Sequence, residues 1–254
     1  MRLGKALAVF AFAGAAVFTL GAQQKPAHIM SIEFQTPKNG MLKKYEEGRK
    51  EKAKWHRDKK DPRPLFVWET MTGEHTGTFV VGEPAVTWKE MDTPPISDDE
   101  DQAKWEATMG QYVESLVTHY YQHQPDLSWP STEKMPAKFA EVITFNVHQG
   151  KVESFVADIK KINAAISKAK WGSHYNFYAL SYGGKGNTFV LVVDHANYAD
   201  FAEPDKTFNQ MLSDAMGKDA AVAFMKGLDA SIDSTEAQIV KFRPDLSYIP
   251  DGMK

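Results

Sequence analysis

A histidine-rich segment near the middle of the chain holds the first candidates for chemistry. His119, Tyr121 and His123 alternate with other residues, so in a β-strand they project from one face. A histidine in a pocket can take a proton from a substrate or ligate a metal. The two histidines would lie roughly 13 Å apart, too far to share one metal ion. We interpret His119 as a candidate catalytic base, and Tyr121 and His123 as candidate ligand-binding residues, with a solvent-exposed strand end as the alternative.

A second aromatic strip occurs in the later half of the chain. His174, Tyr178 and Tyr182 would share one strand face, and Trp68 occupies the position equivalent to Tyr178 in the earlier half. His174 is a second candidate base, and the three aromatic residues could form a cage for a flat ligand. Aromatic residues in strands also pack against each other without any ligand, so ordinary sheet packing stays open as the alternative.

Other ionisable residues give weaker indications. Glu69 falls in the middle of a predicted strand and could be a general base with a raised pKa or an edge residue in solvent. Asp194 and His195, like His56 and Asp58, match no metal-ligand spacing, and we expect both pairs in solvated loops. The chain contains no nucleophile elbow, zinc-protease motif, phosphate-binding loop or dinucleotide fingerprint.

The segments that would position these residues occur twice. The sequence Pro-Asp-Leu-Ser at 125–128 returns at 244–247, and Thr-Phe-Val at 78–80 returns at 188–190. A repeat of about 110–120 residues is too long for a solenoid unit, so it indicates two tandem copies of one domain. We expect repeat 1 at 29–129, a linker at 130–138, repeat 2 at 139–248 and a tail at 249–254.

Each copy shows the order strand, helix, strand, strand, helix, strand, which is the ferredoxin-like plan. The helix that follows the first strand of repeat 2 has an apolar stripe, whereas its counterpart in repeat 1 is thinned by charge. A long helical region at 205–230 should break near Met216 and Gly217. The predicted strands lie at 29–35, 65–71, 77–81, 115–122, 141–148, 175–182, 188–193 and 236–242.

A ferredoxin-like sheet carries its helices on one face, and its other face needs cover. Because segments such as 189–193 are apolar at every position, both sheet faces should be buried, and two fused sheets can cover each other. We therefore predict an α+β protein in which two ferredoxin-like repeats form one intramolecular barrel.

Element order, duplication and segments such as Thr76-Gly77-Thr78-Phe79-Val80 make residues 29–248 similar to the dimeric α/β-barrel superfamily. That group includes the antibiotic-biosynthesis monooxygenase-like, NIPSNAP-like and chlorite-dismutase-like families. The resemblance implies a space between the sheets that holds a small apolar or aromatic ligand and, in some members, haem. No motif particular to one member is present, and fold alone does not fix function.

The beginning of the chain has the features of an export signal. Arg2 and Lys5 precede an uncharged apolar run at 6–20, and the small residues Gly21 and Ala22 follow. The run of about 15 residues is shorter than the roughly 20 needed to span a bilayer. We expect a signal peptide at 1–22 and a periplasmic or secreted protein without a stable membrane anchor after cleavage, with an uncleaved anchor as the alternative.

Composition narrows the function further. The chain has no cysteine, which excludes disulfides, thiolate chemistry and a cysteine-linked lipid anchor. Its formal charge of −3 falls to about −5 without Arg2 and Lys5, and this mild acidity argues against nucleic acid as a partner. The basic stretch at 43–60 is interleaved with acidic residues, which is typical of a solvated helix face.

These observations favour an exported protein that binds a small apolar or aromatic molecule between its sheets, with no cofactor required. The alternatives are a cofactor-independent oxygenase or isomerase with His119 or His174 as base, a haem protein with a histidine axial ligand, and a structural envelope protein with a filled core. Whether the protein is an enzyme stays open. Further oligomerisation also stays open, although fusion removes the need to dimerise for barrel closure.

Overall fold

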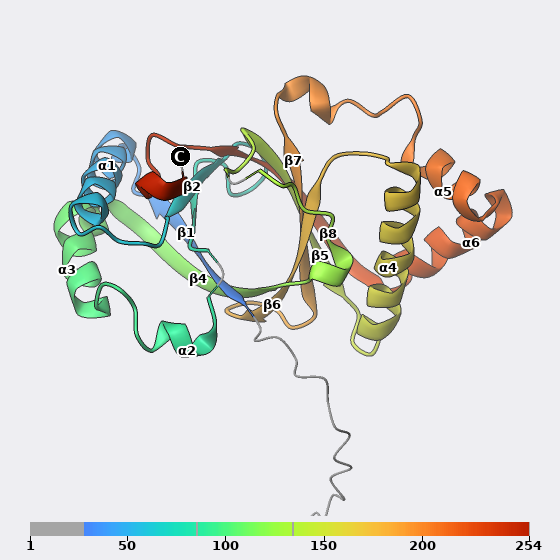
Figure 1. Ribbon diagram of the computed structural model, residues 1–254, viewed down its shortest axis with the longest axis horizontal. Coiled ribbons are helices and arrows are strands. Elements are labelled where there is room, and N and C mark those ends of the chain that lie inside the picture. Colours follow the sequence, from blue (N-terminus) through green and yellow to red (C-terminus); the bar gives the residue numbers. More distant parts are fainter. Residues whose placement is uncertain (1–27, 85, 134, 254) are drawn as a thin grey trace, which may run out of the picture.

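The computed structural model describes residues 28–84, 86–133 and 135–253, and the expected signal peptide at 1–22 lies outside them. Within these residues, eight antiparallel strands close into one barrel in the order β1-β3-β2-β8-β5-β7-β6-β4 (Figure 1). The strands are β1 (Ile29–Pro37), β2 (Phe66–Thr70), β3 (Phe79–Gly82), β4 (Val113–His123), β5 (Phe139–Val147), β6 (Tyr175–Tyr182), β7 (Thr188–His195) and β8 (Ile232–Phe242).

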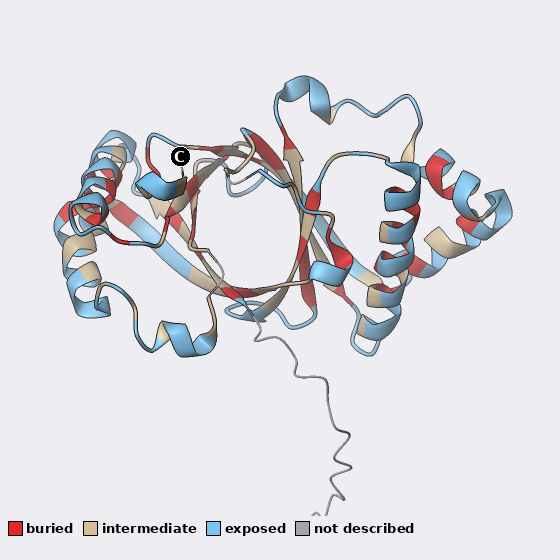
Figure 2. Cartoon of the chain, viewed as in Figure 1, coloured by how far each residue is buried: buried red, intermediate tan, exposed pale blue. Residues whose placement is uncertain are grey.

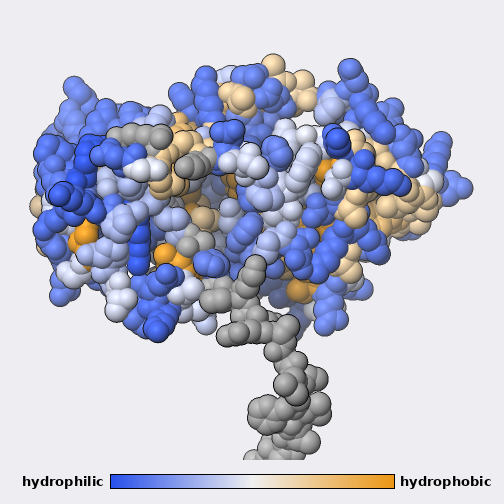
Figure 3. All heavy atoms as spheres, viewed as in Figure 1, coloured by the Kyte–Doolittle hydropathy of each residue, from blue (hydrophilic) through white to orange (hydrophobic). Residues whose placement is uncertain are grey.

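Helices cover the barrel from two opposite sides (Figure 1). Those of repeat 1 are α1 (Leu42–Asp58), α2 (Trp88–Met91) and α3 (Asp98–Thr108), and those of repeat 2 are α4 (Val152–Ala169), α5 (Phe208–Met216) and α6 (Lys218–Asp229). Their outer surfaces are largely exposed (Figure 2); in the view of Figure 3 they are mostly hydrophilic on the side of α1 and α3 and include hydrophobic areas on the side of α5 and α6. The predicted α+β fold, with two ferredoxin-like repeats in one intramolecular barrel, is confirmed. Among the described helices, none combines the length and the apolar character that crossing a membrane would require.

Repeat 2 is built on an apolar layer between helices and sheet. The stripe on α4 buries Phe155, Ile159 and Ile162 against strand residues such as Phe177 and Phe189. Burying one such side chain contributes about 1.5–3 kcal/mol relative to exposure. The expected break in the last helical region is confirmed at Gly217, whose φ of +88° is a conformation that glycine adopts without steric cost.

Repeat 1 has a polar layer where repeat 2 has an apolar one. Arg49, Lys52 and His56 on α1 are only 3%, 6% and 4% exposed, so the prediction of a solvated helix face is wrong for these positions. The prediction of a loop at His56 is also wrong, since both His56 and Asp58 lie within α1. Asp58 does stay exposed at the end of the helix.

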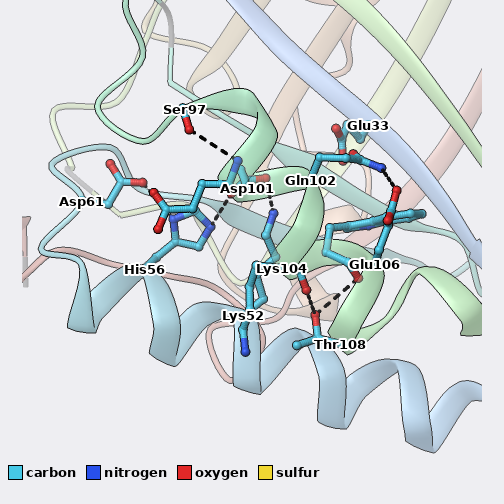
Figure 4. A network of polar contacts seen from close by, with 12 residues as sticks. Glu33, Lys52, His56, Asp61, Ser97, Asp101, Gln102, Lys104, Glu106 and Thr108 are labelled. Carbon is cyan, nitrogen blue, oxygen red and sulfur yellow. Dashed lines mark hydrogen bonds and ion pairs between the residues drawn. The ribbon is translucent and has the colours of Figure 1, made fainter.

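Charged residues of α1 can be buried because α3 places Asp101 against this helix (Figure 4). Asp101 pairs with Lys52, and its Oδ1 lies 3.3 Å from His56 Nε2. On the other side of the ring, His56 Nδ1 lies 2.8 Å from Asp61 Oδ2. A buried cation is tolerated when a carboxylate faces it, so charges far apart in the sequence neutralise each other in this layer.

The repeated Pro-Asp-Leu-Ser segments explain how the halves hold each other. Leu127, at the end of repeat 1, is buried in the apolar core of repeat 2, and Leu246, at the end of repeat 2, is buried in the core of repeat 1. Ser128 Oγ accepts the Phe177 N–H at 2.9 Å, and Ser247 Oγ accepts the Val67 N–H at 2.9 Å. Each repeat thus closes on its partner through the same motif, which we call the reciprocal clasp.

Candidate ligand-binding site

The barrel contains a cavity of about 300 Å³ between the strands of its two repeats, a volume at the lower end for small-molecule sites. Alternate residues of each strand point inward, so both repeats supply its wall. We call this space the inner cavity. Its strand-borne apolar lining consists of Met30, Ile32, Phe34, Phe66, Trp68, Val80, Ala140, Val142, Val190, Val192 and Val240.

A few polar groups interrupt this apolar wall: Tyr121, Asn176, Tyr178, Asp194, Gln238 and Thr144 from the strands, and Ser131 and Glu133 from the linker. Burial raises the pKa of Tyr121 to about 12, and burial together with the charge of Asp194 raises the pKa of Tyr178 to about 12. Both phenols therefore stay protonated at neutral pH. Burial also raises the pKa of Asp194, against the opposing influence of His174 and His195.

Sheet register fixes the depth of these groups. Asp194 lies opposite Ala140 on β5, Val192 lies opposite Val142, and Val190 lies opposite Thr144. Asp194 therefore occupies one end of the inner cavity. Two further layers of side chains lie beyond it, Val192 with Val142 and then Val190 with Thr144, and successive layers are about 6–7 Å apart. Linker residues including Ser131 and Glu133 line the cavity as well, and the linker runs across the barrel opening in Figure 1.

A second cavity of about 290 Å³ adjoins the first, and we call it the outer chamber. The two spaces share five lining residues, which are Ser131, Glu133, Met135, Ala137 and Asp194. The remaining lining residues of the outer chamber are Ser173, His174, His195, Ala196 and Asp200. The two spaces thus meet at the linker and at Asp194.

Four of the predicted site residues lie on these cavities. Trp68, Tyr121 and Tyr178 line the inner cavity, and His174 lines the outer chamber. Tyr182 lies elsewhere: it is 66% exposed, and its ring centroid is 5.7 Å from that of Trp88.

His119 and His123 stand behind the lining rather than in it. His119 Nδ1 lies 3.0 Å from the Tyr121 hydroxyl, and His123 Nε2 lies 3.2 Å from Asn176 Oδ1. Burial lowers the pKa of both histidines, so each is suited to hold its neighbour as a neutral hydrogen-bonding group. In this structure they orient Tyr121 and Asn176.

The two repeats place different chemistry at equivalent positions. Tyr178 on β6 pairs with His123 on β4, and their ring centroids are 5.3 Å apart. Trp68 on β2 pairs with Phe242 on β8, at 5.8 Å. The aromatic contact between β4 and β6 is therefore polar and contains titratable groups, whereas the contact between β2 and β8 is apolar.

Sequence reasoning missed several lining residues, and Asp194 is the most important. Asp194 and His195 were expected in a solvated loop, yet both belong to β7 and His195 is only 7% exposed, stacked on Phe201 at 4.1 Å. The alternation of Val190, Val192 and Asp194 could have revealed an inward carboxylate. Gln238 and Glu133 left no such pattern.

Glu69 has a structural role. Its Oε2 accepts a hydrogen bond from Arg243 Nη1 at 2.7 Å, and another nitrogen of the same guanidinium contacts Glu46 Oε1 at 2.7 Å. A carboxylate held in this ion pair joins the end of repeat 2 to repeat 1. It does not line either cavity.

Comparison with known proteins identifies solved structures of similar fold. No protein-family model and no curated protein sequence matches the chain. Solved structures match over most of its length. A putative monooxygenase from Lactobacillus acidophilus has 10% identity and a TM-score of 0.55, covering 85% of this chain and 94% of that one. A putative monooxygenase from Fusobacterium nucleatum has 13% identity and a TM-score of 0.56, covering 85% and 93%.

A mutant chlorite dismutase from Candidatus Nitrospira defluvii has 9% identity and a TM-score of 0.51, covering 87% of this chain and 93% of that chain. At such identities the likeness concerns the fold. The likeness supports the predicted barrel fold.

Proposed function

We propose that this protein binds a small, largely apolar or aromatic molecule in the inner cavity. The single observation that carries the proposal is a cavity of about 300 Å³ with a mostly apolar wall and a few polar groups, which is the usual composition of a ligand pocket. A structural barrel with a filled core would not leave this space, because protein interiors are normally close-packed.

A cavity-filling substitution tests the proposal. Val192→Phe should project its larger side chain into the inner cavity, and because that space is open the variant should fold with a stability change below about 1.5 kcal/mol. Titration with 2-naphthol, followed by its fluorescence, should give one-to-one binding to the wild-type chain. The dissociation constant should rise at least tenfold in Val192→Phe.

The control is Val222→Phe on α6, where the valine is 64% exposed. It should bind 2-naphthol as the wild type does. Equal binding by all three proteins would place the probe outside the barrel, and absence of binding by the wild type would contradict the proposal.

A cofactor-independent oxygenase or isomerase is the second candidate, and Asp194 favours it. A carboxylate of raised pKa at the boundary of two cavities is suited to take a proton from a bound carbon acid. His174, beside it on the outer chamber, is the alternative base. Oxygen uptake in the presence of anthrone, above the rate without protein, tests this reaction class. Asp194→Asn or His174→Asn should then abolish the excess uptake.

Haem fits this lining poorly. None of the described residues around the inner cavity is a histidine, and the raised pKa values of Tyr121 and Tyr178 disfavour a tyrosinate ligand. His174 lines the outer chamber but not the inner cavity. No step of the function is assigned to haem, and titration with haem should give no Soret shift typical of histidine ligation.

Export completes the proposal, on the basis of the charged and apolar pattern at 1–22. Expression of the full chain in a Gram-negative host should yield a periplasmic protein whose intact mass lacks about 21 or 22 residues. A full-length product retained in the inner membrane would support the uncleaved anchor instead.

A further inference from the structure

Three residues that line the inner cavity offer acceptor atoms to a ligand. Asp194 and Glu133, the latter exposed on the linker, carry carboxylates, and Gln238 Oε1 is buried without a hydrogen-bond partner among the described residues. By contrast, the amide oxygen of Asn176 and the hydroxyl of Tyr121 are already engaged by His123 and His119. A buried acceptor without a donor is unfavourable, so a bound molecule that offers N–H groups would relieve this cost.

Around both cavities, the carboxylates and imidazoles of the described lining residues are those of Glu133, Asp194, Asp200, His174 and His195. No lysine or arginine is among these described residues. The Asp200 carboxylate already accepts hydrogen bonds from the backbone N–H groups of Ala196 and Asn197. Glu133 and Asp194 remain for a ligand, and both touch the inner cavity and the outer chamber.

The outer chamber adjoins this end of the inner cavity. It is continuous with the inner cavity through the five shared lining residues. Both ring nitrogens of His195, which belongs to its wall, are buried without a hydrogen-bond partner among the described residues. If the head group of a ligand occupied the outer chamber, the apolar part of the same ligand would lie in the inner cavity.

From this arrangement we propose that the two cavities form one bipartite site for an amphipathic cation, an aromatic amine whose ring system fills the inner cavity and whose ammonium group lies between Asp194 and Glu133. The inference rests on the proposed function, since it names the class of molecule bound there. Neutral and cationic ligands should share the ring position, and the carboxylates should discriminate between them.

Three matched probes test the proposal on the full chain at pH 7.5: 2-naphthylmethylamine, 2-naphthylmethanol and 2-naphthoate. They share a ring system and differ in the charge of the head group. By calorimetric titration the amine should bind at least tenfold more tightly than the alcohol, and the carboxylate should bind more weakly than both. Charge-assisted hydrogen bonds are about twice as strong as neutral ones.

Isosteric substitutions locate the effect. Asp194→Asn and Glu133→Gln should each weaken binding of the amine at least fivefold and leave binding of the alcohol unchanged. The control Glu203→Gln, at an exposed carboxylate outside both cavities, should leave all three affinities unchanged. Rescue of 2-naphthoate binding in the double variant Asp194→Asn, Glu133→Gln would add support.

The outcomes separate this inference from the proposed function. If the alcohol binds in the barrel but the amine gains nothing, or if the carboxylate binds most tightly, the bipartite cation site is wrong and the binding function stands. If none of the three probes binds, both are contradicted.

Discussion

The negative charge of Asp194 should favour the proposed function but reduce the stability of the folded protein. Its carboxylate sits at the end of β7 on the shared boundary of the two cavities, and burial raises its pKa. A carboxyl group whose folded pKa lies above its unfolded value favours folding at low pH. That contribution is lost as the pH rises through the folded pKa.

Asp194→Asn should therefore stabilise the protein at pH 7 and give no gain below about pH 3.5, where the wild-type carboxyl group is protonated in both states. The gain should be below about 1 kcal/mol, because partial exposure screens the charge. Urea unfolding at the two pH values measures it. Equal or lower stability of the variant at pH 7 would show that the charged form is satisfied by partners.

Strand alternation grouped Tyr121 with His119 and His123, and Tyr178 with His174 and Tyr182, but it could not say which of them reach the cavity. In the structure Tyr121 and Tyr178 line the inner cavity. Asp194 was missed because the predicted strand ended at 193, one residue too early to include it. Glu133 could not be placed, since the linker has no periodicity.

At the scale of the elements, α1 and α3 form the layer that most clearly depends on pH. Burial lowers the pKa of His56, but the carboxylates of Asp101 and Asp61 beside its ring raise it more, and the net shift is upward. For Asp101, burial raises the pKa, while His56 and Lys52 lower it to about 2 overall. The layer is therefore most favourable when the histidine is protonated and the aspartate is ionised.

The sign of each shift sets the pH window. The contribution of His56 should be complete below its unfolded pKa of about 6.5 and lost as the pH rises through the higher folded value. That of Asp101 should be present above about pH 4 and lost as the pH falls toward 2. Thermal unfolding from pH 5 to pH 9 should show a decline in wild-type stability that is reduced in His56→Gln. An unchanged pH profile in that variant would contradict this account.

Asp101→Asn tests the same layer at constant pH. It removes the charge that faces Lys52 and His56, and hydrogen bonds to charged groups contribute about 1.5–3 kcal/mol. A loss of that size at pH 6 is expected by urea unfolding. The matched change Asp99→Asn, at an exposed position on the same helix, should cost less than about 0.5 kcal/mol.

The contrast between α1 and α4 shows the limit of sequence patterns for elements. The stripe of α4 was readable because apolar residues recur every three or four positions. In α1 the buried residues include Arg49, Lys52 and His56. The partners of Lys52 and His56 come from α3 and from a loop, so no local pattern marks these charged positions as buried. The charge pairing that buries them is a tertiary effect.

For the whole molecule, the reciprocal clasp makes the two repeats depend on each other. Leu127 belongs by sequence to repeat 1 and by packing to repeat 2, and Leu246 has the opposite arrangement. Leu127→Ala should cost about 2–5 kcal/mol. Hydrogen exchange should rise first in α4 and β6, which pack around that site. Faster exchange confined to β4 would show that the segment stabilises its own repeat.

Architecture was the most predictable level. The duplicated Pro-Asp-Leu-Ser segment indicated two copies, and the apolar strands indicated that their sheets cover each other. The exchange of that segment between repeats was not predictable, because a repeat identifies equivalent residues but does not say which copy each one packs against.

The central claim is that the space between the two sheets is where the small molecule binds. Its most direct test is nuclear magnetic resonance of the valine methyl groups with bound 2-naphthol. The account predicts nuclear Overhauser contacts from the naphthol ring to the methyl groups of Val142, Val190, Val192 and Val240. Contacts confined to Val152 and Val156 on α4, or to Val222 on α6, would contradict it.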